Sequence, residues 1–431
     1  MKRFNKLLLL LPAMLLTACN FKYVYVIEGL DLGGGDSEGS GGGDGIDDAG
    51  TYDIKVWVDD KIVDLTRTQI QQFASESMGK YTINATVEPQ SESTAAASML
   101  QDVQSGADLF IFAQDQLARL KVAGAIAKQT GSYGSFIRMN NDEGSVAAAS
   151  IGENLYAFPI TSDNGYFLYY DKSIISDEDA KDMTTILAKC KAAGKTLNFE
   201  ARSNGFYGAS YFLATGCKST WTLDEQTGKF TDFEDTFSSD KGLIAAKALK
   251  ELDDTKAVST TAQASRLGNT SAALVSGIWE YEVALGRLGD KLGCAELPSF
   301  TVDGTKYHLG SYDGYKLMGV KPQVDSKKAS VCRKLAQYLT GQSCQTQRFN
   351  QVSWGPTNKV SSEADNVLAH PGLAALKAQH EFASQQGQCP GAWFASLATT
   401  CKAIRSTSTD DELRQILENY KNGLPELLSE D

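Results

Sequence analysis

The sequence predicts an α/β protein built from more than one domain. Strand-like and helix-like segments alternate over residues 52–112, which is typical of parallel βαβ units with helices covering the sheet. A chain of 431 residues exceeds the size of one compact core, so two or three domains are expected. Such a chain can form a cleft between its domains.

The first elements follow from the spacing of apolar residues. Strands are predicted at 52–58, 81–89 and 107–112, and helices at 64–79 and 92–106. Ligands of parallel sheets bind beyond the carboxyl ends of the strands. Asp115 and Gln116 follow the third of these strands, and they are therefore candidates for a cleft.

Two helices are predicted near the end of the chain. Residues 325–341 combine Ser326 as the N-cap with Gly341 as the stop. Their apolar stripe consists of Cys332, Leu335, Ala336 and Leu339. Thr409 and Glu412 have the spacing of a capping box before an apolar stripe, which predicts a last helix over 408–424. The α/β character therefore continues to the end of the sequence.

The N-terminal segment has the composition of an export signal. Residues 1–19 begin with basic side chains, continue as an apolar run and end at Cys19. The tetrapeptide LTAC at 16–19 resembles a bacterial lipobox, which implies a lipid such as palmitate on Cys19. A secreted protein cleaved elsewhere is the alternative. Residues 20–51 are rich in glycine, aspartate and serine, and they predict a flexible acidic tether.

Charge and cysteine content narrow the classes of function. The formal net charge is −12, and loss of the export signal would make it about −15, which argues against nucleic acid as a partner. Seven of the eight cysteines follow Cys19. Cys332–Cys344 and Cys389–Cys401 are the first candidates for disulfides, and buried free thiols are the alternative. With three histidines and no CxxC pair, neither a metal site nor a cofactor is expected.

Four segments in order resemble one family. They are residues 105–127, 156–174, 269–300 and 310–359. Together they resemble bacterial extracellular solute-binding proteins of the maltose/maltodextrin-binding type, the capture components of carbohydrate ABC transporters. The likeness extends over nearly the whole chain from about residue 52.

The resemblance implies a two-lobed periplasmic-binding-protein-like fold with discontinuous lobes joined by a hinge. The N-lobe would comprise 52–160 and 310–355, and the C-lobe 161–309 and 356–431. Crossings are expected near Pro159, Gly310 and Gly355.

The resemblance also implies a set of sugar contacts, since a pyranose stacks on aromatic rings and pairs its hydroxyls with polar groups. The candidates are Trp279, Asp115, Asp163, Trp393, Phe112, Gln116, Asn204, Phe206, Tyr207 and Tyr312. Trp279 is expected to be the main stacking platform. Core packing remains open for Trp393 and Phe112, a turn for Asp163, and a structural position for Tyr312. An acidic residue expected beside Asn204 is absent.

The implied function is capture of a sugar, maltodextrin or another oligosaccharide, without catalysis. The expected partners are that ligand, the permease subunits of an ABC transporter and the membrane, reached through the lipid on Cys19. A monomer anchored outside the cytoplasm is expected. The alternatives are a sensor with the same fold, a non-sugar solute, and a glycoside hydrolase that uses Asp115 and Asp163 as its carboxylate pair. Because the candidates include neither Arg nor Lys, a phosphate ligand is not favoured.

Overall fold

The computed structural model describes residues 47–407 and 409–429. The predicted export signal, Cys19 and most of the predicted tether lie outside the described residues. At the described end of that tether, strand β1 begins at Gly50, and the carboxylate of Asp48 is buried against Lys80 and Lys334. The first strand therefore begins two residues before the predicted Tyr52.

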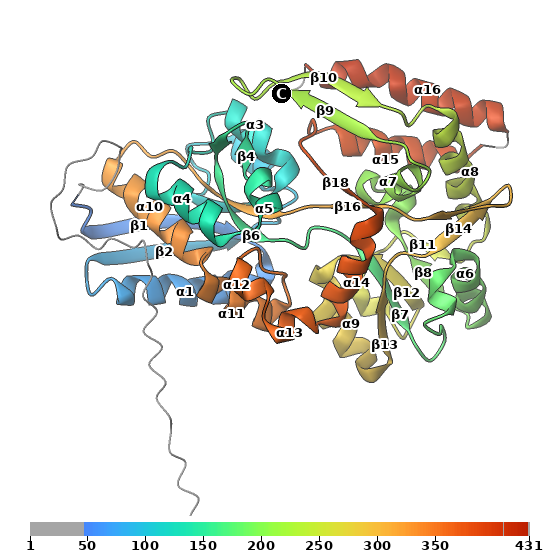
Figure 1. The fold of residues 1–431 in the computed structure, drawn as a ribbon, viewed down its shortest axis with the longest axis horizontal. Helices are drawn as coiled ribbons and strands as arrows, with labels where there is room; N and C mark the ends of the chain where they lie inside the picture. Colours follow the sequence, from blue (N-terminus) through green and yellow to red (C-terminus); the bar gives the residue numbers. More distant parts are fainter. Residues whose placement is uncertain (1–46, 408, 430–431) are drawn as a thin grey trace, which may run out of the picture. The chain divides into compact units, whose positions relative to one another are not determined.

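The first sheet has five strands in the order β2-β1-β3-β17-β6 (Figure 1). Their bounds are β1 Gly50–Val58, β2 Tyr81–Pro89, β3 Leu109–Ala113, β6 Ala157–Thr161 and β17 Lys316–Val320. β1 is parallel to β2 and β3, which confirms the predicted βαβ units. β17 comes from late in the chain and lies antiparallel between β3 and β6, so the sheet is mixed.

Helices cover this sheet much as the apolar spacing predicts. They are α1 Val63–Glu76, α2 Ala95–Gln101, α3 Leu117–Val122, α4 Gly131–Asn140, α5 Glu143–Ala148, α10 Ser326–Leu339 and α11 Gln342–Val352. Ile70 and Phe73 of α1 are buried, and so is the predicted stripe of α10. The predicted N-cap of α10 is wrong by one residue: Asp325 is the cap, because its carboxylate accepts a hydrogen bond from the Lys327 amide at 2.9 Å.

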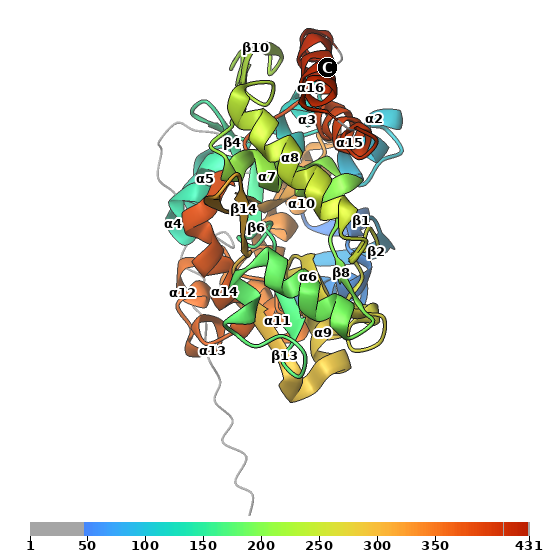
Figure 2. The ribbon, with the colours of Figure 1, turned by 90° about the vertical axis from the view of Figure 1, so that its right-hand side faces the viewer.

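The second sheet also has five strands, in the order β11-β8-β12-β7-β13. Their bounds are β7 Phe167–Asp171, β8 Thr196–Asn198, β11 Val258–Ser259, β12 Ser271–Ser276 and β13 Leu292–Ala295. Around it lie α6 Met183–Ala192, α7 Gly205–Ala214, α8 Asp240–Asp254, α9 Tyr281–Leu288, α14 Pro371–Gln379, α15 Trp393–Ile404 and α16 Asp410–Leu427. Figure 2 shows α6 in front of β8, against which it packs. The capping box of Thr409 and Glu412 is confirmed at the start of α16.

The remaining elements are short. They are β4 Ser150–Ile151, β5 Asn154–Leu155, β9 Ser219–Leu223, β10 Phe230–Asp235, β14 Ser299–Val302, β15 Thr305–His308, β16 Ser311–Asp313, β18 Ala383–Gln385, α12 Lys359–Ser362 and α13 Asp365–Leu368. No helix among the described residues is long and apolar enough to span a membrane.

The connections between the two sheets lie side by side. The segment after β6 contacts both other connections, because the Ser162 amide donates to the Gly355 carbonyl at 2.9 Å and the Asn164 amide to the Gly314 carbonyl at 3.1 Å. The Asp142 amide donates to the Thr357 carbonyl at 3.1 Å, so the chain just after Gly355 still contacts α5 beside the first sheet. The predicted lobe boundaries stay a prediction.

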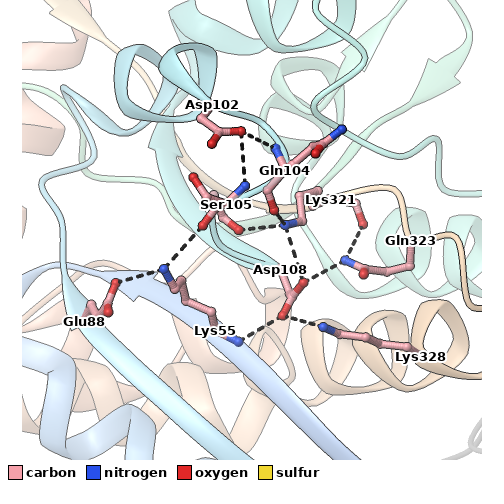
Figure 3. Close-up of polar contacts among 10 residues, drawn as sticks. Lys55, Glu88, Asp102, Gln104, Ser105, Asp108, Lys321, Gln323 and Lys328 are labelled. Carbon is pink, nitrogen blue, oxygen red and sulfur yellow. Dashed lines mark hydrogen bonds and ion pairs between the residues drawn. The ribbon is translucent and has the colours of Figure 1, made fainter.

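One end of the first sheet is closed by a charged cluster around Asp108 (Figure 3). The Asp108 carboxylate accepts hydrogen bonds from the Lys55 amide at 3.0 Å and the Gln323 side chain at 2.9 Å. It also forms ion pairs with Lys328 at 3.0 Å and Lys321 at 3.7 Å. These contacts tie β1, β3 and α10 together at the end of the sheet where β3 begins.

The predicted disulfides are absent from the described residues. Cys332 and Cys344 are free thiols buried on α10 and α11, and Cys401 is a free thiol buried on α15. Each lies in the apolar packing of its helix, and burial raises the pKa of these three thiols to about 12. The alternative of buried thiols therefore describes them.

Candidate functional site

A cavity of about 470 Å³ lies where the ends of the two sheets face each other. Its lining residues are Asp59, Lys61, Ser91, Glu92, Ser93, Ala113, Asp115, Gln116, Arg119, Asn164, Asn204, Phe206, Tyr207, Trp279, Gln386, Gly391 and Phe394. This set includes six of the ten predicted sugar contacts, and its volume is in the range of small-molecule sites.

One wall of the cavity is charged, and it is formed by the first sheet. Asp59 follows β1, Glu92 follows β2, and Asp115 follows β3. Because the three strands are parallel neighbours, their carboxyl ends meet at one edge of the sheet. We call this set, with Lys61 and Gln116, the charged wall.

Asp115 is held in place by a relay of amide side chains. The side-chain nitrogen of Gln386 donates to the Asp115 carboxylate at 3.0 Å, and its side-chain oxygen accepts from the side-chain nitrogen of Asn164 at 3.0 Å. Burial raises the pKa of Asp115 to about 7, despite the opposing charge of Arg119. Asp115 is therefore a carboxyl group whose charge changes near neutral pH.

Gln116 positions backbone rather than reaching for a ligand. Its side-chain oxygen accepts from the Ala96 amide at 3.1 Å, and its nitrogen donates to the carbonyls of Glu92 at 2.9 Å and Ser93 at 3.2 Å. Both ends of this amide are therefore used to hold the turn that carries Glu92.

The opposite wall is aromatic. It consists of Phe206 and Tyr207 on α7, Trp279 after β12, and Phe394 on α15. The rings pack edge to face: Phe206 lies 5.4 Å from Tyr207 and 5.8 Å from Phe394 between centroids. We call these four residues the aromatic wall.

Trp279 lies in a single 3₁₀ turn, Ile278–Glu280, directly after β12. Its ring covers Gly277 so closely that a Cβ on that glycine would lie 2.1 Å from the indole. The Trp279 carbonyl accepts from Lys61 at 2.8 Å, which joins this turn to the charged wall. Trp279 is half-buried and lines the cavity, and its role as a stacking platform stays a prediction.

Asn204 caps a helix at the edge of the cavity. Its side-chain oxygen accepts from the Phe206 amide at 3.0 Å, and its nitrogen donates to Glu200 at 3.3 Å. Asn204 therefore fixes the start of α7, from which Phe206 and Tyr207 project.

Four predicted contacts lie behind the cavity instead of at it. Phe112 is wholly buried within β3, and Tyr312 and Trp393 are buried behind the aromatic wall. Asp163 is also wholly buried, and its carboxylate accepts from the Gly355 amide at 2.5 Å. Their side chains are occupied by core packing or by the connection between the sheets, and none of the four lines this cavity, so their role as sugar contacts stays a prediction.

Tyr312 and Trp393 still support the aromatic wall. The Tyr312 ring stacks on Phe206 at 5.8 Å, and the Trp393 ring lies 4.6 Å from Phe394. The Trp393 indole donates to the Tyr420 hydroxyl at 2.9 Å, which fixes its orientation. These two residues form a second layer behind the rings that line the cavity.

The cavity lining also includes residues that were not among the predicted contacts: Asp59, Lys61, Glu92, Arg119 and Phe394. Asp59 and Glu92 could have been found, because each follows a predicted strand as Asp115 does. Lys61 and Arg119 also change one inference: the cavity does contain cationic side chains, so a lack of Arg and Lys cannot be used against an anionic ligand.

The comparisons with known proteins point to one family. Residues 68–375 match the family described as bacterial extracellular solute-binding protein. The chain belongs to this family. A comparison with curated protein sequences gives no match.

Solved structures of solute-binding proteins share the fold. One structure described as "with acarbose" has a TM-score of 0.76 and 25% identity and covers 88% of this chain and 100% of its own. The maltodextrin-binding protein MalE1 of L. casei BL23, without ligand, has a TM-score of 0.72 and 20% identity over 87% and 99% of the two chains. A cyclo/maltodextrin-binding protein complexed with maltotetraose has a TM-score of 0.67 and 19% identity over 92% and 99%. The protein is thus an extracellular solute-binding protein close in structure to maltodextrin- and acarbose-binding proteins.

Proposed function

We propose that this solute-binding protein captures a maltodextrin-like oligosaccharide in the cavity between the charged and aromatic walls. The observation that carries the proposal is the division of chemistry across the cavity: carboxylates and amides on one side, four aromatic rings on the other. A pyranose has an apolar face that stacks on rings and an edge of hydroxyls that hydrogen-bond to carboxylates and amides.

Trp279, Phe206 and Tyr207 are the proposed stacking surface, and Asp115, Glu92 and Asn204 the proposed polar contacts. The similar structures support this choice of ligand class, since two are described as complexes with acarbose and with maltotetraose.

The proposed mechanism is closure of two lobes on the ligand. The lobes are those expected from the sequence, each built around one of the two sheets, with the connections at Ser162, Gly314 and Gly355 as the hinge. A sugar that touches both walls binds the closed form more tightly than the open form, and it shifts the population accordingly.

Delivery to an ABC transporter and anchoring through Cys19 complete the proposal. Lipid on Cys19 would keep the monomeric protein beside the permease and raise its effective concentration there. Metabolic labelling with a palmitate analogue tests the anchor: label on the wild type that is lost in Cys19→Ser supports it, and label on both refutes it.

Binding without catalysis is favoured over hydrolysis by the placement of Asp115 and Asp163, the two carboxyls of the alternative catalytic pair. Asp115 lines the cavity, whereas Asp163 is buried against Gly355. A glycosidase needs both carboxyl groups at the scissile bond.

Isothermal titration with maltose, maltotriose, maltotetraose and acarbose tests the proposed ligand class, with xylo- and fructo-oligosaccharides as controls. Binding of the gluco-oligosaccharides in the micromolar range, together with no cleavage products after prolonged incubation, is the expected result. Binding of none of these sugars, or release of shorter sugars, would overturn the proposal.

A further inference from the structure

A lysine is buried at the edge of the cavity, where the two walls meet. Lys316 is the first residue of β17 and pairs with Ala113 at the end of β3 and Thr161 at the end of β6. Its side chain is 0% exposed. A fully buried ammonium is costly unless opposite charges or aromatic faces surround it.

Lys316 has both kinds of neighbour. Its Nζ lies 3.0 Å from a carboxylate oxygen of Glu92 in the charged wall. It also lies 4.2 Å from the ring centroid of Trp354 and 5.2 Å from that of Trp279 in the aromatic wall. One cation therefore contacts a member of each wall.

The charges that face this ammonium come from three turns. Asp59 follows β1, Glu92 follows β2, and Asp163 follows β6, and all three raise the pKa of Lys316 against the effect of burial. Lys61 acts on Glu92, and Arg348 is the further cation near Asp163. Lys316 is the ammonium buried among these carboxyls.

The pKa of Glu92 is shifted in the opposite direction to the pKa values of Asp59 and Asp163. Burial alone would raise the pKa of Glu92, but the charge of Lys316, the hydrogen bonds to the carboxylate and the charge of Lys61 together outweigh it, and the pKa lies below the ordinary value of 4.5. For Asp59 and Asp163 burial prevails, and their pKa values are raised. Lys316 therefore favours the charged form of Glu92, with which it forms an ion pair.

We propose that Lys316 is a positioning residue of the binding cavity: its buried ammonium keeps the Glu92 carboxylate charged at the cavity wall and links it to the indole of Trp279. This inference rests on the proposed sugar-binding function. A charged carboxylate accepts stronger hydrogen bonds from sugar hydroxyls than a neutral carboxyl does. Lys316 thus acts on the ligand through Glu92.

Lys321 at the opposite end of the same strand is a matched control. It follows β17 and belongs to the Asp108 cluster (Figure 3), where its Nζ donates to the carbonyls of Gln104 at 2.9 Å and Gly106 at 2.7 Å. Loss of Lys321 removes a partly exposed cation at the end of the same sheet without touching the cavity. Its effect measures destabilisation alone.

The first arm of the test needs no ligand. Glutamate labelled with ¹³C at the carboxyl carbon is followed by NMR against pH in the full chain, and Glu92→Gln assigns the Glu92 signal. We expect this carboxyl to titrate below 4.5 in the wild type and above it in Lys316→Met, with no change in Lys321→Met. Lys316→Gln serves as the second variant should Lys316→Met fail to fold. A Glu92 signal that titrates alike with and without Lys316 overturns the proposal.

The second arm measures maltotetraose affinity from pH 8 to pH 5. The dissociation constant of Lys316→Met relative to wild type is expected to increase at least about tenfold as the pH falls, since neutral Glu92 loses a charge-assisted contact. In a Glu92→Gln background, Lys316→Met should change the dissociation constant by a factor that is constant with pH. This result would assign the pH dependence to Glu92 instead of Asp59, Asp115 or Asp163.

A ratio that changes with pH in both backgrounds, or in neither, overturns the proposal. Failure of the wild type to bind any sugar would instead refute the proposed function, and the NMR arm alone would then decide whether Lys316 holds the charge of Glu92.

Discussion

The two walls of the cavity are built in different ways. The charged wall comes from residues that directly follow three parallel strands, so each carboxyl is placed by the backbone of its own strand. The aromatic wall comes from α7, the turn after β12 and α15, and it depends on a second layer of rings, Tyr312 and Trp393, behind it. The charged wall is thus set by local chain geometry, whereas the aromatic wall is set by packing between distant segments.

The largest effect is expected from Phe112→Ala, which should lower the free energy of unfolding. This variant distinguishes a core residue from a residue of either cavity wall. Phe112 is wholly buried in β3, 5.6 Å from the ring of Phe110, so its loss leaves a void that should cost about 3–5 kcal/mol of unfolding free energy. Urea unfolding measures this loss, with exposed Val324→Ala as the control. Sugar affinity of the folded variant should be unchanged, and a selective loss of affinity would return Phe112 to the site.

Trp279→Ala should remove most of the aromatic wall's contribution to binding. Loss of the stacking surface is expected to cost about 2 kcal/mol, or roughly 30-fold in the dissociation constant. Titration calorimetry measures it against Trp221→Ala, a half-buried tryptophan of β9 outside the cavity lining. Equal affinities for the two variants would mean that Trp279 is a packing residue.

Glu92→Gln tests the charged wall in the same assay. Replacing a charged acceptor by a neutral amide should weaken maltotetraose binding about tenfold at pH 7.5. Glu88→Gln is the matched control, because Glu88 lies on β2, the strand that Glu92 follows, but accepts a hydrogen bond from Trp57 at 2.9 Å outside the cavity lining. A similar loss in both variants would indicate a general effect of charge instead of a contact.

The smallest effect, about threefold, is expected from the charge of Asp115. Since its pKa is raised to about 7, the carboxylate form is lost as the pH falls through 7, and affinity should fall with it. The effect of pH on stability has the opposite sign, because ionising Asp115 costs free energy in the folded state but not in the unfolded state. The free energy of unfolding of the wild type, relative to Asp115→Asn, should therefore fall as the pH rises from about 4 to 7. A wild-type affinity that is constant from pH 6 to 8 would contradict the prediction.

Strand positions and helix faces were predictable from the sequence because apolar periodicity is a local property. Strand 81–89 has the predicted bounds, and the buried stripe of α10 was identified residue by residue. The placement of β17 between β3 and β6 was not predictable, since it joins residues more than 150 positions apart. That placement brings Lys316 to the cavity.

The candidate site was predictable where a residue follows a strand and unpredictable where rings compete for the core. Asp115 was found by its position after a strand and Trp279 through the family resemblance, and both line the cavity. Trp393 and Phe394 are adjacent in sequence, yet only Phe394 lines the cavity while Trp393 is buried behind it. Adjacent residues on a helix point about 100° apart, and only the packing of α15 decides which of them faces the ligand.

By itself the sequence determined the α/β class, the order of the strands along the chain and the family resemblance, since these depend on residue patterns along the chain. The tertiary structure decided which side chains share the cavity, because the cavity joins elements that are hundreds of residues apart. It also decided the charge of those side chains. Whether Glu92 is charged or Asp115 neutral depends on burial and on the charges of Lys316 and Arg119, neighbours that only the folded chain supplies.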